Sequence, residues 1–163
     1  MATIVLAMAI AALFLVMCPG RVHGQIVRDL TGTWELNLAK SDFGGVPGPK
    51  SDSWVVTRDG FTYHIKQSAD QGQGPVEIRT DWPTDSGDVT NKLPNGMTMA
   101  VKAHREGPAQ VFTIAISMNG QTASESGRQL LSEDGRTLTR YMTVNPVGGD
   151  SINIRLVYDK KPN

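Results

Sequence analysis

The chain has 163 residues, a length typical of a single domain, and its 16 Lys and Arg residues balance its 16 Asp and Glu residues. The resulting formal net charge of zero at pH 7 leaves no overall field that would attract nucleic acid, an anionic membrane or an acidic substrate. We therefore expect no nucleic-acid partner, and the single cysteine, Cys18, excludes an intramolecular disulfide.

The chain begins with an uncharged apolar segment. Residues 2–17 are rich in Ala, Leu, Ile, Val and Met, and Pro19-Gly20 interrupts the run. A membrane-spanning helix needs about 20 apolar residues, so this shorter run is more typical of a signal peptide, although no Lys or Arg precedes it. With Gly24 as the small residue at a cleavage site, the segment predicts a signal peptide over residues 1–24. The mature chain would then be periplasmic or secreted, with no stable membrane span.

Cys18 allows a second interpretation of this segment, as a lipoprotein signal in which the cysteine becomes a lipid anchor. Such signals have a small residue directly before the cysteine, whereas Met17 stands there. We therefore favour a cysteine that is removed with the signal peptide. A mature chain starting at Gln25 has no cysteine, so its stability must come from packing and hydrogen bonds alone.

The rest of the chain consists of short runs of alternating apolar and polar residues between turn signals. Asp59-Gly60, Asn95-Gly96, Asn119-Gly120 and Asp134-Gly135 are dipeptides that tolerate the positive φ of two-residue hairpin loops. Between them the apolar period is two, which predicts antiparallel strands with one buried and one solvated face. In chain order, the buried rows are expected to be Trp34, Leu36, Leu38; Trp54, Val56; Phe61, Tyr63, Ile65; Val76, Ile78; Met97, Met99, Val101; Phe112, Ile114, Ile116, Met118; Leu138, Met142, Val144; and Ile152, Ile154, Leu156, Tyr158.

Strands of this one-sided polarity, joined by tight turns, predict an all-β fold. The simplest arrangement is an antiparallel up-and-down meander closed into a β-barrel of about 8–10 strands, because closure leaves no exposed sheet edge. A two-sheet sandwich is the alternative, but it usually needs long crossing connections, and the long irregular stretches are residues 41–51, 69–75 and 83–93. We expect one barrel domain over residues 25–163.

The first predicted strand opens with a motif that is found in a known superfamily. Residues 32–37 read Gly-Thr-Trp-Glu-Leu-Asn, which resembles the Gly-x-Trp opening of lipocalins and other calycin barrels. The continuation, residues 39–44, is similar to that of uncharacterised exported bacterial β-barrel proteins. Residues 134–139 and 156–160 resemble the ending of fatty-acid-binding-protein-like barrels. The resemblance implies a lipocalin-like barrel.

This resemblance assigns a structural role to Trp34, because the tryptophan of the lipocalin motif plugs one end of the barrel. An arginine from the last strand typically covers that tryptophan through a cation–π contact, and Arg155 is the candidate for this position. Strict alternation, however, places Arg155 on the face opposite Tyr158. Either a bulge re-aims Arg155, or Arg140 or Arg128 takes its place.

Fatty-acid-binding proteins also hold the ligand carboxylate with an Arg-x-Tyr pair on their final strand. In this chain Arg155 and Tyr158 are separated by two residues, which sends their side chains to opposite faces of a strand. The resemblance therefore does not imply that Arg155 and Tyr158 bind a ligand carboxylate together.

Aromatic and methionine residues on the buried rows define the candidate ligand site. Because methionine is deformable, an interior lined by methionine and aromatic rings suits a small apolar guest, but it also suits an irregularly packed core. Barrels of about eight strands can be filled by their own side chains, so a cavity and a filled core remain alternatives. The predicted interior ligand-binding residues are Trp54, Phe61, Tyr63, Met97, Met99, Phe112, Met118, Met142 and Tyr158.

Residue types that support catalysis or metal binding are sparse in the predicted mature chain. His64 and His104 fall on the solvated rows without a His-x-His or acidic cluster beside them, so we expect neither a metal nor a cofactor. The mature chain also lacks a cysteine nucleophile and a Gly-x-Ser-x-Gly elbow. Glu77 and Asp81 would lie about 13 Å apart along one strand, too far for a catalytic carboxylate pair. We do not expect an enzyme.

Three functional hypotheses follow. The first is an exported barrel that binds a small hydrophobic ligand in its interior. The second is a protease-inhibitor-like barrel that acts through the segment ahead of the first strand, Gln25–Thr31. The third is a structural envelope protein without a ligand. The sequence does not specify the oligomeric state.

Overall fold

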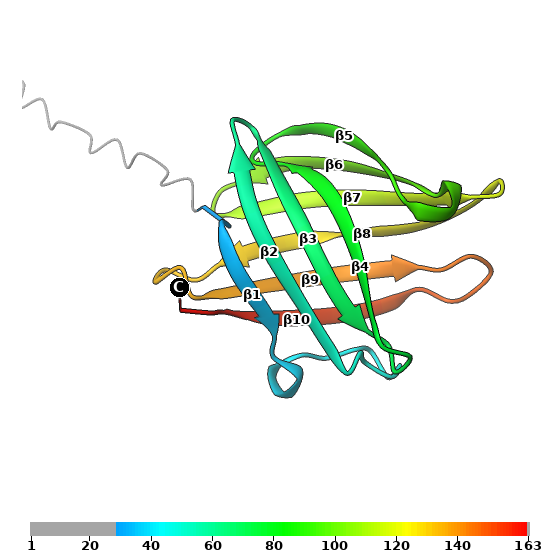
Figure 1. Ribbon diagram of the computed structural model, residues 1–163, viewed down its shortest axis with the longest axis horizontal. Coiled ribbons are helices and arrows are strands. Elements are labelled where there is room, and N and C mark those ends of the chain that lie inside the picture. The colour runs from blue at the N-terminus through cyan, green and yellow to red at the C-terminus, as the bar shows by residue number, and fades with distance from the viewer. Residues whose placement is uncertain (1–28, 163) are drawn as a thin grey trace, which may run out of the picture.

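The computed structural model describes residues 29–162, which form a nearly closed β-barrel of ten antiparallel strands (Figure 1). The predicted signal peptide, residues 1–24, and Cys18 lie outside the described residues. The strands are β1 (Gly32–Leu36), β2 (Ser51–Asp59), β3 (Thr62–Asp70), β4 (Pro75–Pro83), β5 (Gly87–Lys92), β6 (Thr98–Glu106), β7 (Ala109–Met118), β8 (Gln121–Leu131), β9 (Thr137–Asn145) and β10 (Ile152–Lys160), and two short 3-10 turns are η1 (Leu38–Lys40) and η2 (Pro94–Gly96).

Two sets of contacts close the sheet. In the strand order β4-β3-β2-β1-β10-β9-β8-β7-β6-β5, the first strand pairs with the last, and Trp34 lies opposite Lys160. At the two ends of this order, the Asn91 side chain of β5 accepts a hydrogen bond from the Asp81 backbone N–H of β4 at 2.6 Å and donates one to the Asp81 carbonyl at 3.1 Å. One continuous, nearly closed sheet confirms the predicted barrel and excludes the two-sheet sandwich.

The hairpin turns follow the turn chemistry of the sequence. Asn119 and Gly120 both have positive φ, 51° and 77°, as a two-residue turn between β7 and β8 of type I′ requires. Between β2 and β3 the pair that ends the ladder is Asp59 and Thr62, so the turn is Gly60-Phe61 rather than the predicted Asp59-Gly60. Gly60, with φ of 54°, therefore holds the first central position of this turn, where glycine is favoured.

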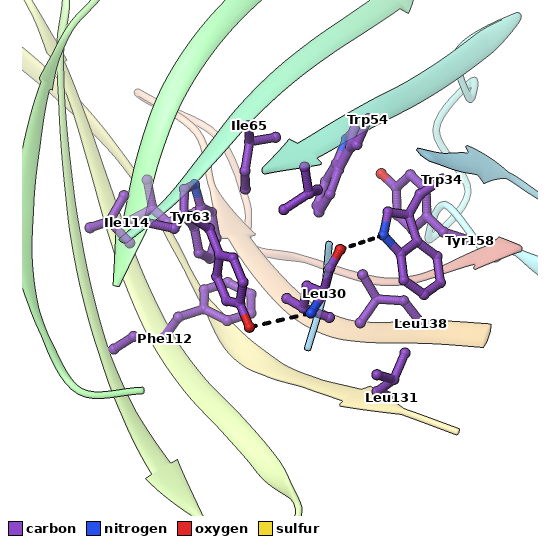
Figure 2. Close-up of a cluster of buried hydrophobic side chains, with 14 of the residues drawn as sticks. Leu30, Trp34, Trp54, Tyr63, Ile65, Phe112, Ile114, Leu131, Leu138 and Tyr158 are labelled. Carbon is purple, nitrogen blue, oxygen red and sulfur yellow. Dashed lines mark hydrogen bonds between the residues drawn. The ribbon is translucent and has the colours of Figure 1, made fainter. Parts of the chain in front are cut away.

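A tightly packed core fills one end of the barrel, where the chain enters β1 (Figure 2). Trp34 is completely buried there, and its indole N–H donates to the Leu30 carbonyl at 2.8 Å. The backbone N–H of Leu30 in turn donates to the Tyr63 hydroxyl at 3.3 Å. Leu131 and Leu138 lie beside this contact in the same cluster. The segment before β1 thus lies against the barrel, held by side chains from β1 and β3.

Lys160, rather than an arginine, lies over Trp34. Its ammonium nitrogen is 5.3 Å from the centre of the Trp34 ring, a cation–π geometry that follows from the direct pairing of the two residues across β1 and β10. Gly32 makes room for this lysine: a Cβ at that position would lie only 2.5 Å from Lys160 Cε, and its φ of 124° is unfavourable for other residues. In the Gly-x-Trp motif, Gly32 therefore leaves the space in which Lys160 lies over the Trp34 ring.

Arg155 does not cover Trp34, so the prediction for this residue is wrong. β10 pairs with β9 in an unbroken register from Ile152 to Asp159, and no bulge re-aims the arginine. Its exposed side chain lies on the outer face, where Nη2 donates to the Lys40 carbonyl at 3.2 Å. The two other arginines considered for covering Trp34 contact different rings. Arg128 lies over the Tyr141 ring, and Arg140 lies over the Trp54 ring inside the barrel.

Candidate functional site

The barrel encloses a cavity of about 270 Å³ next to the packed core. Ten of its lining side chains are Trp, Ile, Leu or Met, contributed by seven of the strands on both sides of the barrel. Six polar residues complete the wall: Asp52, Gln67, Thr80, Glu125, Arg140 and Tyr158. Pockets for small molecules usually start at about 300 Å³, so this cavity fits a guest at the small end of that range.

Asp52 is the centre of a buried hydrogen-bonded group on this wall. The Tyr158 hydroxyl donates to its Oδ2 at 2.8 Å, and the Gln67 amide N–H₂ lies 3.0 Å from both carboxyl oxygens. Burial raises the pKa of Asp52 above its ordinary value, although these hydrogen bonds and the positive charge of Arg140 act in the opposite direction. Burial likewise raises the pKa of Tyr158 well above its ordinary value, so this hydroxyl remains a neutral donor.

Arg140 of β9 is the positive charge of the cavity. Its guanidinium carbon lies 4.9 Å from the ring centre of Trp54, 5.2 Å from that of Trp82 and 4.8 Å from that of Phe112. Burial lowers the pKa of Arg140, and the nearby Tyr158 and carboxyl groups partly offset this decrease. Arginine nevertheless stays protonated at any physiological pH.

The guanidinium lacks acceptors for part of its N–H groups. Within residues 29–162, Nε and Nη2 of Arg140 are buried without any hydrogen-bond partner. Buried polar groups are almost always paired, and leaving one unpaired costs about 1–3 kcal/mol. The aromatic faces around Arg140 stabilise its charge but offer no lone pair, so the cavity presents an unmet demand for an acceptor atom.

Four of the predicted ligand-binding residues line this cavity, namely Trp54, Met99, Met142 and Tyr158. Two others, Tyr63 and Phe112, are buried in the adjoining core, each with 1% of its surface exposed. The structure therefore brings these six residues together on the inner face of the barrel.

The remaining three predicted residues do not line the interior, so their assignment is wrong. Phe61 is 84% exposed because it is the second residue of the β2–β3 turn rather than the first of β3. Met118 is 44% exposed because it lies at the tip of the β7–β8 hairpin, past the end of the cavity. Met97 is half-buried where η2 ends, and its carbonyl accepts from the Leu93 N–H of the same turn.

Apart from Tyr158, the polar residues of the site are absent from the predicted set, because the predicted buried rows consist of apolar and aromatic residues. Asp52 precedes Trp54 by two positions, Gln67 follows Ile65 by two, and Arg140 stands between Leu138 and Met142. Each of them occupies an inward position of its strand. A polar residue in register with an apolar row is thus the signal that would have identified them.

The histidines of the described part lie outside the cavity. His64 Nδ1 is 2.7 Å from an Asp81 carboxyl oxygen, and His104 Nε2 is 2.9 Å from a Glu106 carboxyl oxygen, in both cases with half-exposed side chains. Residues 29–162 contain no group of three or more His, Cys, Asp or Glu placed to hold a metal ion. Nor do they contain a helix long and apolar enough to cross a membrane.

Solved structures show the same architecture at low sequence identity. A secretory abundant heat soluble protein of Ramazzottius varieornatus superposes with a TM-score of 0.58 at 15% identity, covering 81% of this chain and 95% of that one. Lipid binding protein 8 of Caenorhabditis elegans gives 0.52 at 14% identity, covering 80% and 94%. A fatty acid transporter named REP1-NXSQ gives 0.50 at 15% identity, covering 83% and 98%. No family model and no curated protein matches the chain in sequence.

These likenesses establish the fold. The described residues form an all-β, nearly closed up-and-down barrel, as the alternation and turns of the sequence predict. With ten up-and-down strands, the chain has the architecture of the lipid-binding and heat-soluble proteins to which it is similar.

Proposed function

We propose that the chain is an exported barrel that binds a small, mostly apolar molecule in its interior cavity. The observation that carries this proposal is the combination of a cavity of about 270 Å³ with mostly apolar walls and a buried guanidinium whose Nε and Nη2 lack acceptors. A filled core would leave neither the space nor the unpaired donors. The names of two similar structures, a lipid binding protein and a fatty acid transporter, support the same class of ligand.

The cavity volume limits the size of the guest. If each methylene-sized group occupies about as much space as a water molecule in the liquid, roughly 30 Å³, the cavity holds about nine such groups. Burying nine methylenes gives at most about 7 kcal/mol before the entropic cost of association is subtracted. We therefore expect dissociation constants on the order of 10 μM or weaker for simple guests of this size.

The proposal is one of binding rather than catalysis. Asp52 is held by hydrogen bonds and Arg140 by aromatic contacts, and the two histidines of the described part face solvent. For the alternative of a protease inhibitor acting through Gln25–Thr31, the described part of that arm is docked, since Leu30 is buried against Trp34 and Tyr63. The apolar cavity favours a ligand binder over a purely structural envelope protein.

Filling the cavity tests the binding function. Ile116 is half-buried on the cavity wall, so Ile116→Trp should occupy the space and weaken binding of a nine-carbon ligand such as 2-nonanone at least tenfold. Val55, which is 44% exposed on the outside, provides the matched variant Val55→Trp, which should bind as the parent does. Titration calorimetry measures the affinities, and circular dichroism checks that both variants fold. Equal binding by both variants would place the ligand outside the barrel.

Export is tested separately from binding. The proposed cleavage after Gly24 predicts that the protein isolated from its host begins at Gln25. N-terminal sequencing of the isolated protein, with fractionation of the cell, measures this directly. An intact Met1, or a lipid attached to Cys18, would contradict the proposed processing.

A further inference from the structure

We propose that the cavity selects an uncharged ligand with a carbonyl-type oxygen, which Arg140 binds, in preference to a free carboxylate of the same length. This inference rests on the proposed binding function and specifies the class of ligand. Its basis is the number of charged groups on the cavity wall and the hydrogen bonds that they already make.

The unpaired atoms of the site are donors. Arg140 lines the cavity and its buried Nε and Nη2 have no acceptor within residues 29–162, while both oxygens of Asp52 already accept hydrogen bonds. A ligand oxygen placed beside the guanidinium would satisfy the donors without displacing Tyr158 or Gln67. An apolar guest, or a guest that only donates, would leave these donors unpaired.

The charge of the wall decides between an uncharged oxygen and a carboxylate. Arg140 is the one basic residue among those that line the cavity, and two acidic residues, Asp52 and Glu125, line it as well. Both carboxyl groups act on the guanidinium through space. A ligand carboxylate would therefore be a third acidic group facing one cation in a space of low dielectric, where an excess of like charge is costly. A ketone, ester or amide oxygen accepts the same hydrogen bonds without adding charge.

A series of nine-carbon ligands tests the proposal on the mature chain at pH 7.5. The probes are 2-nonanone, nonanoate, nonylammonium and nonane, with affinities measured by titration calorimetry or by quenching of tryptophan fluorescence. We expect 2-nonanone to bind at least tenfold more tightly than nonanoate and more tightly than the other two. Tighter binding of nonanoate or nonylammonium would overturn the inference while leaving the proposed function intact. If no probe binds, the proposed function itself fails.

Variants of the wall identify the groups responsible for the selectivity. Glu125→Gln and Asp52→Asn each remove one acidic group and keep the shape, so each should raise the affinity for nonanoate relative to 2-nonanone by at least fivefold. Arg140→Met should abolish the preference for 2-nonanone over nonane. Glu77→Gln is the matched control, because Glu77 is exposed on the outer face in an ion pair with Lys66, and the ratio should not change. An unchanged ratio in both Glu125→Gln and Asp52→Asn would show that wall charge does not set the selectivity.

Discussion

At the scale of single residues, Arg140 has an environment that favours its charge but leaves hydrogen bonds unmade. Three aromatic rings lie within 5.2 Å of its guanidinium carbon, and two nitrogens have no acceptor in the described part of the chain. Replacing a whole buried ion pair with apolar residues of similar size is often neutral or stabilising, whereas removing one partner leaves the other charge uncompensated and truncation leaves a void. The ligand oxygen proposed above would supply the acceptor that these nitrogens lack.

Two substitutions separate a role of Arg140 in ligand binding from a role in the stability of the fold. We expect Arg140→Met to lower the free energy of unfolding less than Arg140→Ala does, because methionine fills more of the space, while both variants leave Asp52 and Glu125 without the guanidinium. Arg140→Ala should cost about 2–4 kcal/mol, because it creates a cavity among the rings of Trp54, Trp82 and Phe112. Urea denaturation measures both values. A large loss in Arg140→Met would show that the arginine is needed for the fold.

Asp52 predicts a pH dependence of stability. Its native pKa lies above the ordinary value of 3.8, mainly because of burial, so protonation favours the folded state. The stabilisation is complete below about pH 3.8 and is lost as the pH rises through the native pKa. Asp52→Asn has no such group to ionise, so its stability relative to the parent chain should increase between pH 3 and pH 7.

Denaturation at a series of pH values measures the stability of Asp52→Asn relative to the parent chain. Asp134 provides a control, because its pKa is shifted in the opposite direction. The Ser132 hydroxyl and the Arg136 backbone N–H hold the pKa of Asp134 below its ordinary value, so its ionised form favours folding. Asp134→Asn should therefore lose stability relative to the parent as the pH rises through this range. If the stability of Asp52→Asn and Asp134→Asn relative to the parent changed in the same direction with pH, the opposite pKa shifts assigned to Asp52 and Asp134 would be wrong.

At the scale of elements, the junction of β4 and β5 depends on one side chain. Both hydrogen bonds between Asn91 and the Asp81 backbone disappear in Asn91→Ala, which should cost about 1–3 kcal/mol and free the two edge strands. We expect faster hydrogen exchange in β4 and β5 with little change in β8. Asn153→Ala, which removes only an exposed contact with Thr143, is the control. Unchanged exchange in β4 would mean that other contacts close the barrel.

The strands also show how far the sequence determines this fold. Alternation and turn dipeptides were sufficient for most of the ten strands, because hairpins are local. β5 and β8 could not be traced in this way. β5 lies within residues 83–93, which the sequence predicts to be irregular, and the inward positions of β8 include Glu125, Gly127 and Gln129, which form no apolar row. A side chain at Gly127 would collide with the Tyr141 carbonyl of β9, so the close approach of β9 requires a glycine at this position. Such packing is known only once the neighbouring strand is placed.

The candidate site was less predictable than the fold for the same reason. Trp54 and Tyr158 could be assigned to the interior from their own strands, but the contact between Tyr158 and Asp52 joins residues 106 positions apart. Whether Arg140 faces an apolar core or an acidic group depends on β2 and β8, which lie far from it in sequence. The polar chemistry of the cavity therefore emerges only from barrel closure.

At the scale of the whole molecule, the pairing of β1 with β10 joins the two ends of the described chain. Residues 34 and 160 face each other, and the Lys161 backbone N–H donates to the Thr33 carbonyl at 2.8 Å. Contacts between such distant residues slow folding, because closing a long loop of chain costs entropy before the contact stabilises it. A growing polypeptide therefore cannot complete its barrel before its last residues have been made.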